Sequence, residues 1–390
     1  MTGSVTTLRD KYETIIVGAG IIGSSTAYYL TELGHRDLLI VEREVPCSGS
    51  TGRCIGGVRQ QFSDELNIRI AMDSVRNMNH VQNDLAVDIQ FLQTGYLLLA
   101  YTEREMEIFE KNIQLQRSMG LKVDLLTPSM LSNLFPSINT ESVLGATFCP
   151  TDGQANPFLL VHFYLSRAME SGARLLKGQE VTSIESTAGR ITGVRIGERD
   201  FIKCDNLINC AGPWARDVAA MAGISIPALP ERHESLVTEK IAPLFKPMIV
   251  DYTREHGCYF QQKENGAVIG CFTPPEVVPG MNYGVSLDFL QEMSRRMIRL
   301  VPELATVSVV RQWSGHYTMT PDAKPIIGPE SGLKGFCNVA AFCGHGLMQG
   351  PRVGELVAEH IVRGEFSLDL SPMSSSRFEN GILTSEELLK

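Results

Sequence analysis

Thr14-Ile15-Ile16-Val17-Gly18-Ala19-Gly20-Ile21-Ile22-Gly23 is the stretch that decides the fold. Its β-branched start predicts a strand, and its three glycines form the G-x-G-x-x-G pattern that joins a strand to a helix. Residues 22–33 predict that helix, which Gly34 ends. A second strand is predicted over residues 37–41, and Glu42 follows it. The unit is therefore strand, helix, strand, with an acid 19 residues after the third glycine.

The three glycines and the acid of this unit each have a physical role in nucleotide binding. Gly18 permits the tight turn, Gly20 lets backbone approach a pyrophosphate, and Gly23 lets the helix pack closely on the strand. The phosphates sit on the helix N-terminus, and Glu42 accepts from ribose hydroxyls. The pattern predicts a dinucleotide site, and the alternative is a glycine-rich packing corner. The motif alone does not separate NAD from FAD.

Later segments favour a large cofactor that crosses the molecule. The segments ARLLKGQEVTSIE, ITGVRI and DFIKC, starting at residue 173, predict a β-meander. It runs into a buried strand at 206–212 and a helix at 213–222 that begins with proline. Near the end, the strand-like GFCNVAAFC at 335–343 leads through a second glycine cluster to a helix predicted over 352–362. Glycine-rich turns from strand to helix thus occur at both ends of the chain.

Composition excludes several classes of protein. The 390 residues suggest two or three domains, and 43% hydrophobic with 20% charged residues describes an ordinary globular chain. A net charge of −9 argues against a nucleic-acid partner. Nine scattered cysteines without C-x-x-C, and no H-E-x-x-H, argue against a disulfide framework and a metal site and favour the cytoplasm. We expect no signal peptide and no membrane span.

The chain resembles the FAD-dependent D-amino-acid-oxidase-like superfamily over nearly its whole length. It is most similar to the β subunits of heteromeric sarcosine oxidases and of dye-linked L-proline dehydrogenases. The motifs that carry the resemblance are GAGIIG (18–23), VERE (41–44), SGSTGRCIGGVRQQF (48–62), QTGYLLLAY (93–101), PTDGQANPF (150–158), NCAGPWA (209–215), RHESLVTE (232–239), TPDAKPIIG (320–328) and GHGLMQGPRVGE (344–355).

The resemblance implies an α/β fold with two discontinuous domains. A Rossmann-like FAD-binding domain, with a mixed sheet and a β-meander, would comprise residues 1–86, 150–225 and 320–368. An α+β substrate domain on an antiparallel sheet would comprise residues 87–149 and 226–319. Residues 369–390 are polar and rich in serine, and we expect them to form a C-terminal surface tail.

The resemblance also implies the cofactor and its contacts. Gly315 stands where some single-chain relatives carry a flavin-linking cysteine, so FAD should be non-covalent. Asn156 stands where some heteromeric relatives tether FMN, so any FMN should bind non-covalently at a subunit interface. The residues expected to contact FAD are Gly18, Gly20, Ile22, Gly23, Glu42, Arg43, Ser50, Thr51, Arg53, Cys54, Gly57, Val181, Cys210, Ala211, Trp214, Gly315, Gly344, His345, Gly346, Leu347 and Met348.

Four side chains are candidates for the substrate end of the site. In related amine oxidases an arginine at the position of Arg59 holds the substrate carboxylate, which suits its planar fork. The alternative is an arginine that braces the loop. His233 would favour a neutral substrate amine or bond the carboxylate, unless it is a core histidine. Tyr259 and Tyr317 occupy positions where the family often places pocket tyrosines.

Two further positions bear on the flavin ring. The loop carrying Gly344, His345 and Gly346 resembles one whose backbone N–H groups stabilise the reduced, anionic ring, and His345 is a candidate catalytic residue there. Val268 aligns with an oxygen-activating lysine of some relatives, which favours a dehydrogenase over an oxidase.

The resemblance implies hydride transfer to FAD from the C–H beside an amine nitrogen. Candidate substrates are sarcosine, proline, hydroxyproline or an opine, and electrons would then pass to a second redox subunit, a dye, a quinone or oxygen. One alternative is an FAD-dependent 2-hydroxy-acid or glycerol-phosphate dehydrogenase. Another is a non-catalytic flavoprotein that assembles a redox complex. Fold alone does not choose among these functions.

Overall fold

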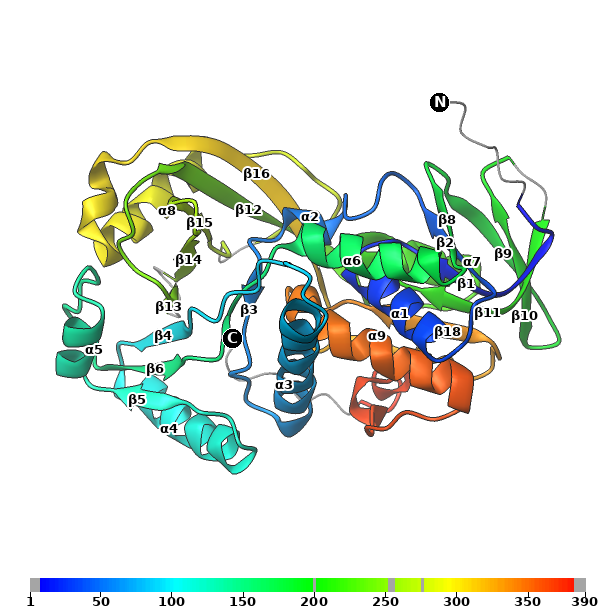
Figure 1. Cartoon of the computed structure of the whole chain (residues 1–390), viewed down its shortest axis with the longest axis horizontal. Helices are drawn as coiled ribbons and strands as arrows, with labels where there is room; N and C mark the ends of the chain where they lie inside the picture. Colours follow the sequence, from blue (N-terminus) through cyan, green and yellow to red (C-terminus); the bar gives the residue numbers. More distant parts are fainter. Residues whose placement is uncertain (1–7, 199–200, 252–256, 275–276, 382–390) are drawn as a thin grey trace.

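Two eight-stranded sheets organise the chain, one in each half of the molecule (Figure 1). The computed structural model describes residues 8–198, 201–251, 257–274 and 277–381. The first sheet has the order β17-β18-β11-β1-β2-β8, with β10 and β9 continuing from β11. Its strands are β1 (Lys11–Val17), β2 (Leu38–Glu42), β8 (Arg174–Lys177), β9 (Val181–Thr187), β10 (Arg190–Ile196), β11 (Phe201–Asn209), β17 (Ile326–Pro329) and β18 (Phe336–Ala340).

The centre of this sheet is parallel and buried on both faces. β18, β11, β1, β2 and β8 run parallel, which explains why residues 15–17 of β1 and 38–41 of β2 are continuous apolar runs. Three helices lie together beside the sheet: α1 (Ile21–Glu32), α6 (Pro157–Glu170) and α9 (Gly346–Arg363) (Figure 1). A Cβ at Gly354 of α9 would overlap the backbone of α1, so glycine permits their close approach. The α/β, Rossmann-like prediction is confirmed.

The second sheet has the order β16-β12-β15-β14-β13-β4-β6-β5 and is antiparallel except where β13 meets β4. Helix α8 packs on one face through Met293 and Met297, against Phe260 and Val268 of the sheet. Its strands are β4 (Tyr96–Ala100), β5 (Asp124–Leu126), β6 (Gly145–Cys149), β12 (Leu229–Lys240), β13 (Met248–Asp251), β14 (Cys258–Gln262), β15 (Ala267–Cys271) and β16 (Val309–Met319).

Shorter elements complete the described chain. A small sheet pairs β3 (Gly57–Val58) with β7 (Gly153–Gln154). The other helices are α2 (Ser50–Arg53), α3 (Glu65–Asn79), α4 (Glu103–Ser118), α5 (Pro128–Leu134), α7 (Ala215–Met221), α8 (Leu287–Leu300), the π-helix η1 (His80–Asp84) and the 3₁₀ turns η2 (Gly212–Trp214), η3 (Pro302–Thr306), η4 (Ser371–Met373) and η5 (Ser375–Arg377). The described strands of each large sheet lie within the ranges expected for one domain, although the exact domain bounds stay a prediction.

Three local predictions were wrong. β8 is a parallel partner of β2, so the meander comprises only β9, β10 and β11. The last helix begins at Gly346 rather than 352, because Pro351 is accommodated inside α9. The segment after residue 368 is not merely a surface tail: Leu370, Met373 and Arg377 are buried. Residues 382–390 of that segment lie outside the described residues.

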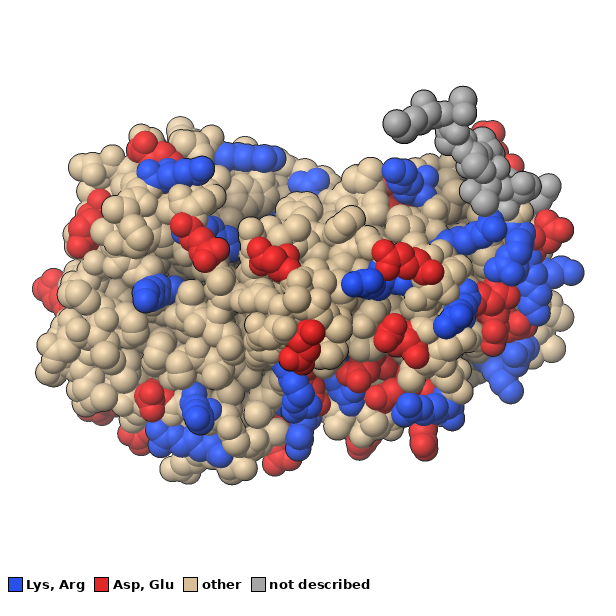
Figure 2. Space-filling model, viewed as in Figure 1, with Lys and Arg blue, Asp and Glu red and all other residues tan. Residues whose placement is uncertain are grey.

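Charged side chains of both signs are interspersed over the face shown in Figure 2, without a large patch of one sign. This face therefore has no basic stripe of the kind that binds the phosphate backbone of a nucleic acid. Among the described residues, no helix is both long enough and apolar enough to cross a membrane.

Candidate active site

A cavity of about 1510 Å³, including its open mouth, extends between the two sheets. One end is lined by the βαβ unit and by α2, and the other by β12, β14, β15 and β16. The residues of the two ends are far apart in the sequence, and the cavity brings them into one space. A long, flat ligand could therefore contact both halves of the molecule.

The turn from β1 to α1 forms the first end of the cavity. Gly18 has φ +103°, and a Cβ there would lie 2.5 Å from the carbonyl oxygen of Cys210. Gly20 is the N-cap of α1 and supplies no capping side chain, although the hydroxyl of Thr51 accepts from the N–H of Ile21 at 3.1 Å. The positive end of α1 with its remaining N–H groups thus faces the cavity, which suits a phosphate.

Glu42 closes the same end. Its carboxylate accepts hydrogen bonds from the backbone N–H of Ala19 at 2.8 Å and of Glu44 at 2.9 Å. A carboxylate has about four lone-pair sites, so two remain for ligand hydroxyls. The guanidinium of Arg43 lies 3.9 Å from the ring centroid of Trp214, and both residues line the cavity.

Arg53 joins the two halves of the cavity wall. Its Nε donates to the carbonyl of Ser48 and a terminal nitrogen donates to that of Ser314, each at 3.2 Å. The guanidinium also lies 4.2 Å from the ring centroid of Tyr283. Arg53 therefore braces α2 against β16, where Gly315 faces its side chain.

An aromatic wall forms the second end of the cavity. The rings of His233 and Tyr317 stack with centroids 3.8 Å apart and an interplanar angle of 22°. The phenol oxygens of Tyr317 and Tyr259 are 2.5 Å apart, and Tyr259 also donates to the sulfur of Cys271 at 2.9 Å. Burial raises the pKa of both tyrosines well above the usual 10, so both are neutral phenols.

His233 presents a nitrogen that no described residue binds. Its Nδ1 lies 3.3 Å from the hydroxyl of Thr273, whereas Nε2 is buried without a hydrogen-bond partner. Burial, with a smaller contribution from His316, lowers the pKa of His233 to about 3. The imidazole is therefore neutral, and its orphaned nitrogen suits a polar ligand atom because buried polar groups are normally bonded.

Arg59 is a buried cation near this wall. It is 4% exposed; one terminal nitrogen donates to the carbonyl of Gln61, and the other lies 3.2 Å from Nε2 of His345. Within the described part of the chain, no carboxylate forms an ion pair with Arg59. A buried charge without an opposite partner is costly, so the position suits an anionic ligand. Arg59 does not line the cavity directly. Tyr317 does, and the charge of Arg59 makes a small contribution to the pKa of its phenol.

A buried carboxylate holds the loop that carries Arg59. Asp152 accepts from the N–H of Gln60 at 2.8 Å and from the side-chain amides of Gln60 and Gln61 at 3.0 and 2.9 Å. Burial raises the pKa of Asp152 to about 6. The hydroxyl of Thr147 completes the network by donating to Gln61 at 2.7 Å. From the sequence, Asp152 was notable only as part of the motif PTDGQANPF, and its supporting role was not predicted.

The N-terminus of α9 also faces the cavity. Gly344 has φ +90°, and a Cβ there would lie 2.6 Å from Cε2 of Tyr317. Gly346 and Leu347 line the cavity, and no side chain caps the helix. His345 is buried beside Arg59, which can only donate, so Nε2 of His345 accepts and its proton lies on Nδ1.

The structure gathers most of the predicted residues around the cavity, but not all. The predicted residues that line it are Gly18, Gly20, Ile22, Glu42, Arg43, Ser50, Thr51, Arg53, Cys54, Val181, Cys210, Ala211, Trp214, His233, Tyr259, Gly315, Tyr317, Gly344, Gly346 and Leu347. Those that do not are Gly23, Gly57, Arg59, His345 and Met348. Whether any of them contacts FAD stays a prediction.

Some predicted residues that do not line the cavity have packing or capping roles. A Cβ at Gly23 would overlap the carbonyl of Gly18, so Gly23 serves the close packing of α1, as its place in the motif indicates. Gly57 approaches the hydroxyl of Tyr96, where a side chain would not fit. Asn156, the position considered for an FMN link, caps α6 by accepting from the N–H groups of Phe158 and Leu159.

Other residues were missed or misplaced by the sequence. Ser235 and Cys271 line the cavity without having been singled out as contacts, although strand alternation puts Ser235 on the same face as His233. His316, a weaker candidate from the sequence, also lines it. Val268 packs in the core against α8, on the face of β15 opposite to Cys271. Val268 therefore does not face the cavity, contrary to the position expected for it, and the preference for a dehydrogenase over an oxidase stays a prediction.

The buried histidines predict a dependence of stability on pH. Burial, with the charge of Arg59 second, lowers the pKa of His345 to about 3 in the folded state, below the unfolded value near 6.5. The unfolded chain therefore binds a proton first, so this contribution is complete above about pH 6.5 and is lost as the pH falls. At pH 5 the loss is about 2 kcal/mol. We expect His345→Gln to reduce the difference in unfolding free energy between pH 7 and pH 5 by that amount, as measured by urea denaturation; an unchanged difference would contradict the assignment.

The chain is similar to proteins of one known family. The family model described as FAD dependent oxidoreductase (DAO) matches residues 13–360. FAD-dependent oxidoreductase domain-containing protein 1 of Bos taurus is 32% identical over 95% of this chain and 86% of its own length. Mitochondrial dimethylglycine dehydrogenase of Homo sapiens is 26% identical over 95% of this chain but only 45% of its own length. L-proline dehydrogenase from P. horikoshii has a similar structure, with a TM-score of 0.91, 34% identity and coverage of 96% of this chain and 100% of that one. The chain therefore belongs to the DAO family of FAD-dependent oxidoreductases, as its motifs and its βαβ cavity predicted.

Proposed function

We propose that this chain oxidises the C–N bond of a small secondary or cyclic amino acid, such as sarcosine, proline, hydroxyproline or an opine, with FAD as the electron acceptor. The observation that carries the proposal is the buried Arg59, which has no carboxylate partner among the described residues and lies behind the aromatic wall of the cavity. Dimethylglycine and L-proline, which name two of the similar proteins, both carry their carboxylate on the carbon atom next to an alkyl-substituted nitrogen.

The cavity fits FAD in shape and in chemistry. The glycine turn and the uncapped start of α1 would hold the pyrophosphate, and Glu42 the ribose. Gly344 and the start of α9 would lie against the flavin ring, because Gly344, Gly346 and Leu347 line the cavity beside Tyr317. When bound there, FAD supplies the two-electron redox chemistry.

Charge at the substrate end selects the form of the amino acid. The lining residues there include His233, Tyr259 and Tyr317, all neutral, and no described acidic side chain lines that end. An ammonium group would find no counter-ion and would be repelled by Arg59. The site therefore favours a substrate with an ionised carboxylate and a neutral amine, whose lone pair can assist hydride loss.

His233 would orient the amine rather than store its proton. A histidine with its pKa lowered to about 3 by burial is too weak a base to hold a proton near neutral pH. Its orphaned Nε2 can still hydrogen-bond the substrate. The proton of the substrate ammonium would then pass to solvent before the C–H bond reacts.

The first prediction from this proposal concerns the cofactor. We expect the purified chain to be yellow and to release intact FAD on acid denaturation, since Gly315 offers no thiol at the linking position. Flavin that stays with the precipitated chain would contradict non-covalent binding. Gly20→Val should prevent binding, because a branched side chain would occupy the place of the pyrophosphate.

The second prediction concerns Arg59. Truncation to Ala removes one partner of a buried charge pair, which costs on the order of 2–5 kcal/mol. We therefore expect kcat/KM per bound flavin to fall roughly 30-fold or more with the best amino-acid substrate. Arg59→Lys should recover only part, since a point charge does not reproduce the fork.

The measurement is anaerobic flavin bleaching against a panel of N-alkyl and cyclic amino acids, with 2-hydroxy acids and glycerol phosphate alongside. Bleaching by hydroxy acids but not by amines would overturn the proposed substrate class. Arg117→Ala is a suitable control, because Arg117 also donates to a backbone carbonyl, that of Val123, but lies on α4 away from the cavity. A value for Arg59→Ala within about threefold of wild type would remove Arg59 from the site.

We also propose that the chain works with a second redox subunit, and that any FMN lies at their interface. The support is the resemblance to the β subunits of heteromeric enzymes. We expect a second flavin- or iron–sulfur-containing polypeptide to co-purify with the natively expressed chain. Full dye-linked activity of this polypeptide by itself would count against the heteromer.

A further inference from the structure

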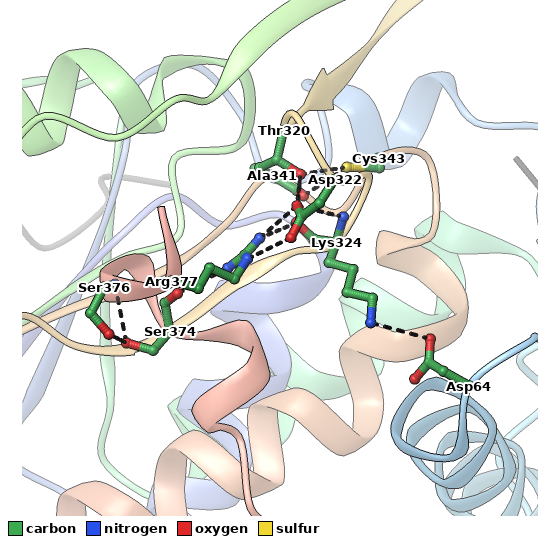
Figure 3. Close-up of polar contacts among 9 residues, drawn as sticks. All are labelled: Asp64, Thr320, Asp322, Lys324, Ala341, Cys343, Ser374, Ser376 and Arg377. Carbon is green, nitrogen blue, oxygen red and sulfur yellow. Dashed lines mark hydrogen bonds and ion pairs between the residues drawn. The ribbon is translucent and has the colours of Figure 1, made fainter. Parts of the chain in front are cut away.

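The segment after α9 contributes a buried arginine to the interior (Figure 3). Arg377 is 4% exposed and donates from Nε to one carboxylate oxygen of Asp322 at 2.7 Å and from a terminal nitrogen to the other at 3.0 Å. Its other bonds reach the backbone carbonyls of Lys324 at 2.8 Å and Ser374 at 3.1 Å. This bidentate geometry fixes the position of Asp322 as well as its charge.

Asp322 connects Arg377 to a threonine. The hydroxyl of Thr320 lies 3.0 Å from Oδ1 of Asp322 and 2.7 Å from the carbonyl of Lys324. Because the proton of that hydroxyl points to Asp322 or Lys324, the thiol of Cys343, 3.6 Å away, is the donor to Thr320, and the same sulfur lies 3.2 Å from the carbonyl of Ala341 (Figure 3). A continuous set of polar contacts therefore runs from Arg377 to the loop that precedes α9.

That loop has a backbone that needs support. Ala341 has φ +57° and Cys343 φ +50°, both in the left-handed region that side chains with a Cβ disfavour. Such conformations persist only where the surroundings hold them. The contacts of Cys343 supply that support, since its N–H also donates to the carbonyl of Thr318 at 3.1 Å. The loop leads directly through Gly344 to the uncapped N-terminus of α9 at the cavity.

We propose that Arg377 is a positioning residue for the flavin: through Asp322, Thr320 and Cys343 it holds the left-handed loop that sets Gly344 and the start of α9 against the ring. The proposal rests on the placement of FAD proposed above, and it is independent of the substrate. The positive end of α9 favours negative charge on the reduced ring, and this effect falls off within the first helical turn. A small displacement of the loop should therefore weaken the stabilisation of an anionic ring.

The test uses the FAD-loaded protein and needs no substrate. Arg377→Lys keeps the charge but loses the fork, and Thr320→Val keeps the shape and the ion pair but removes the connecting hydroxyl. For each variant we would measure FAD content, melting temperature, the dissociation constant of the anionic sulfite adduct and the two-electron flavin potential. We expect sulfite affinity to fall about tenfold and the potential to drop by about 30 mV, with FAD content unchanged.

The matched control is Arg299→Lys, because Arg299 pairs with the buried Asp251 beside the second sheet and does not line the cavity. A lower melting temperature with normal sulfite affinity and potential in both Arg377→Lys and Thr320→Val would overturn the proposal and leave a purely structural ion pair. If Arg377→Lys fails to fold, Thr320→Val decides, since its ion pair is intact. Failure of the wild type to bind FAD would instead refute the proposed placement of the cofactor.

Discussion

The rest of the structure depends on one constraint: at two turns, from β1 to α1 and from β18 to α9, the backbone itself must approach the cavity closely. Gly18 and Gly344 both have positive φ, and each lies where a Cβ would collide with a neighbour. Both turns open onto a helix whose N-cap residue makes no side-chain capping bond. The backbone N–H groups at the start of α1 and of α9 can therefore each face negative charge on a ligand that spans the cavity.

The second sheet supplies side chains to the cavity, where the two turns supply backbone. Strand alternation puts His233 and Ser235 of β12 on the cavity face, while Leu236 enters the core with α8. The polar wall and the apolar core are thus two faces of the same strands. Packing of α8 against one face fixes the aromatic groups on the other, because a shift of register by one residue would exchange them.

The sequence allowed prediction of elements whose signals are local. The βαβ unit, the glycine turns and Glu42 follow from spacing and periodicity, and the family motifs extended this to both ends of the cavity. Predictions failed where long-range pairing decides. β8 pairs with β2 across more than a hundred residues, and nothing in its four residues distinguishes it from a meander strand. The support that Asp152 gives to Gln60 and Gln61, and the burial of Arg377, likewise depend on contacts between distant segments.

Burial also determines the charge of the aromatic end of the cavity. Tyr259, Tyr317 and His233 could each carry charge in water, but burial holds all three neutral. Asp322 satisfies Arg377, whereas Arg59 is bonded only to neutral groups among the described residues. No ion pair among the described residues neutralises the charge of Arg59 behind the aromatic wall, and its side chain is already ordered by the bonds to Gln61 and His345. Arg59 does not line the cavity, so its charge acts on an anionic group there from behind the aromatic wall. Because the side chain is already ordered, this attraction requires no further ordering of Arg59.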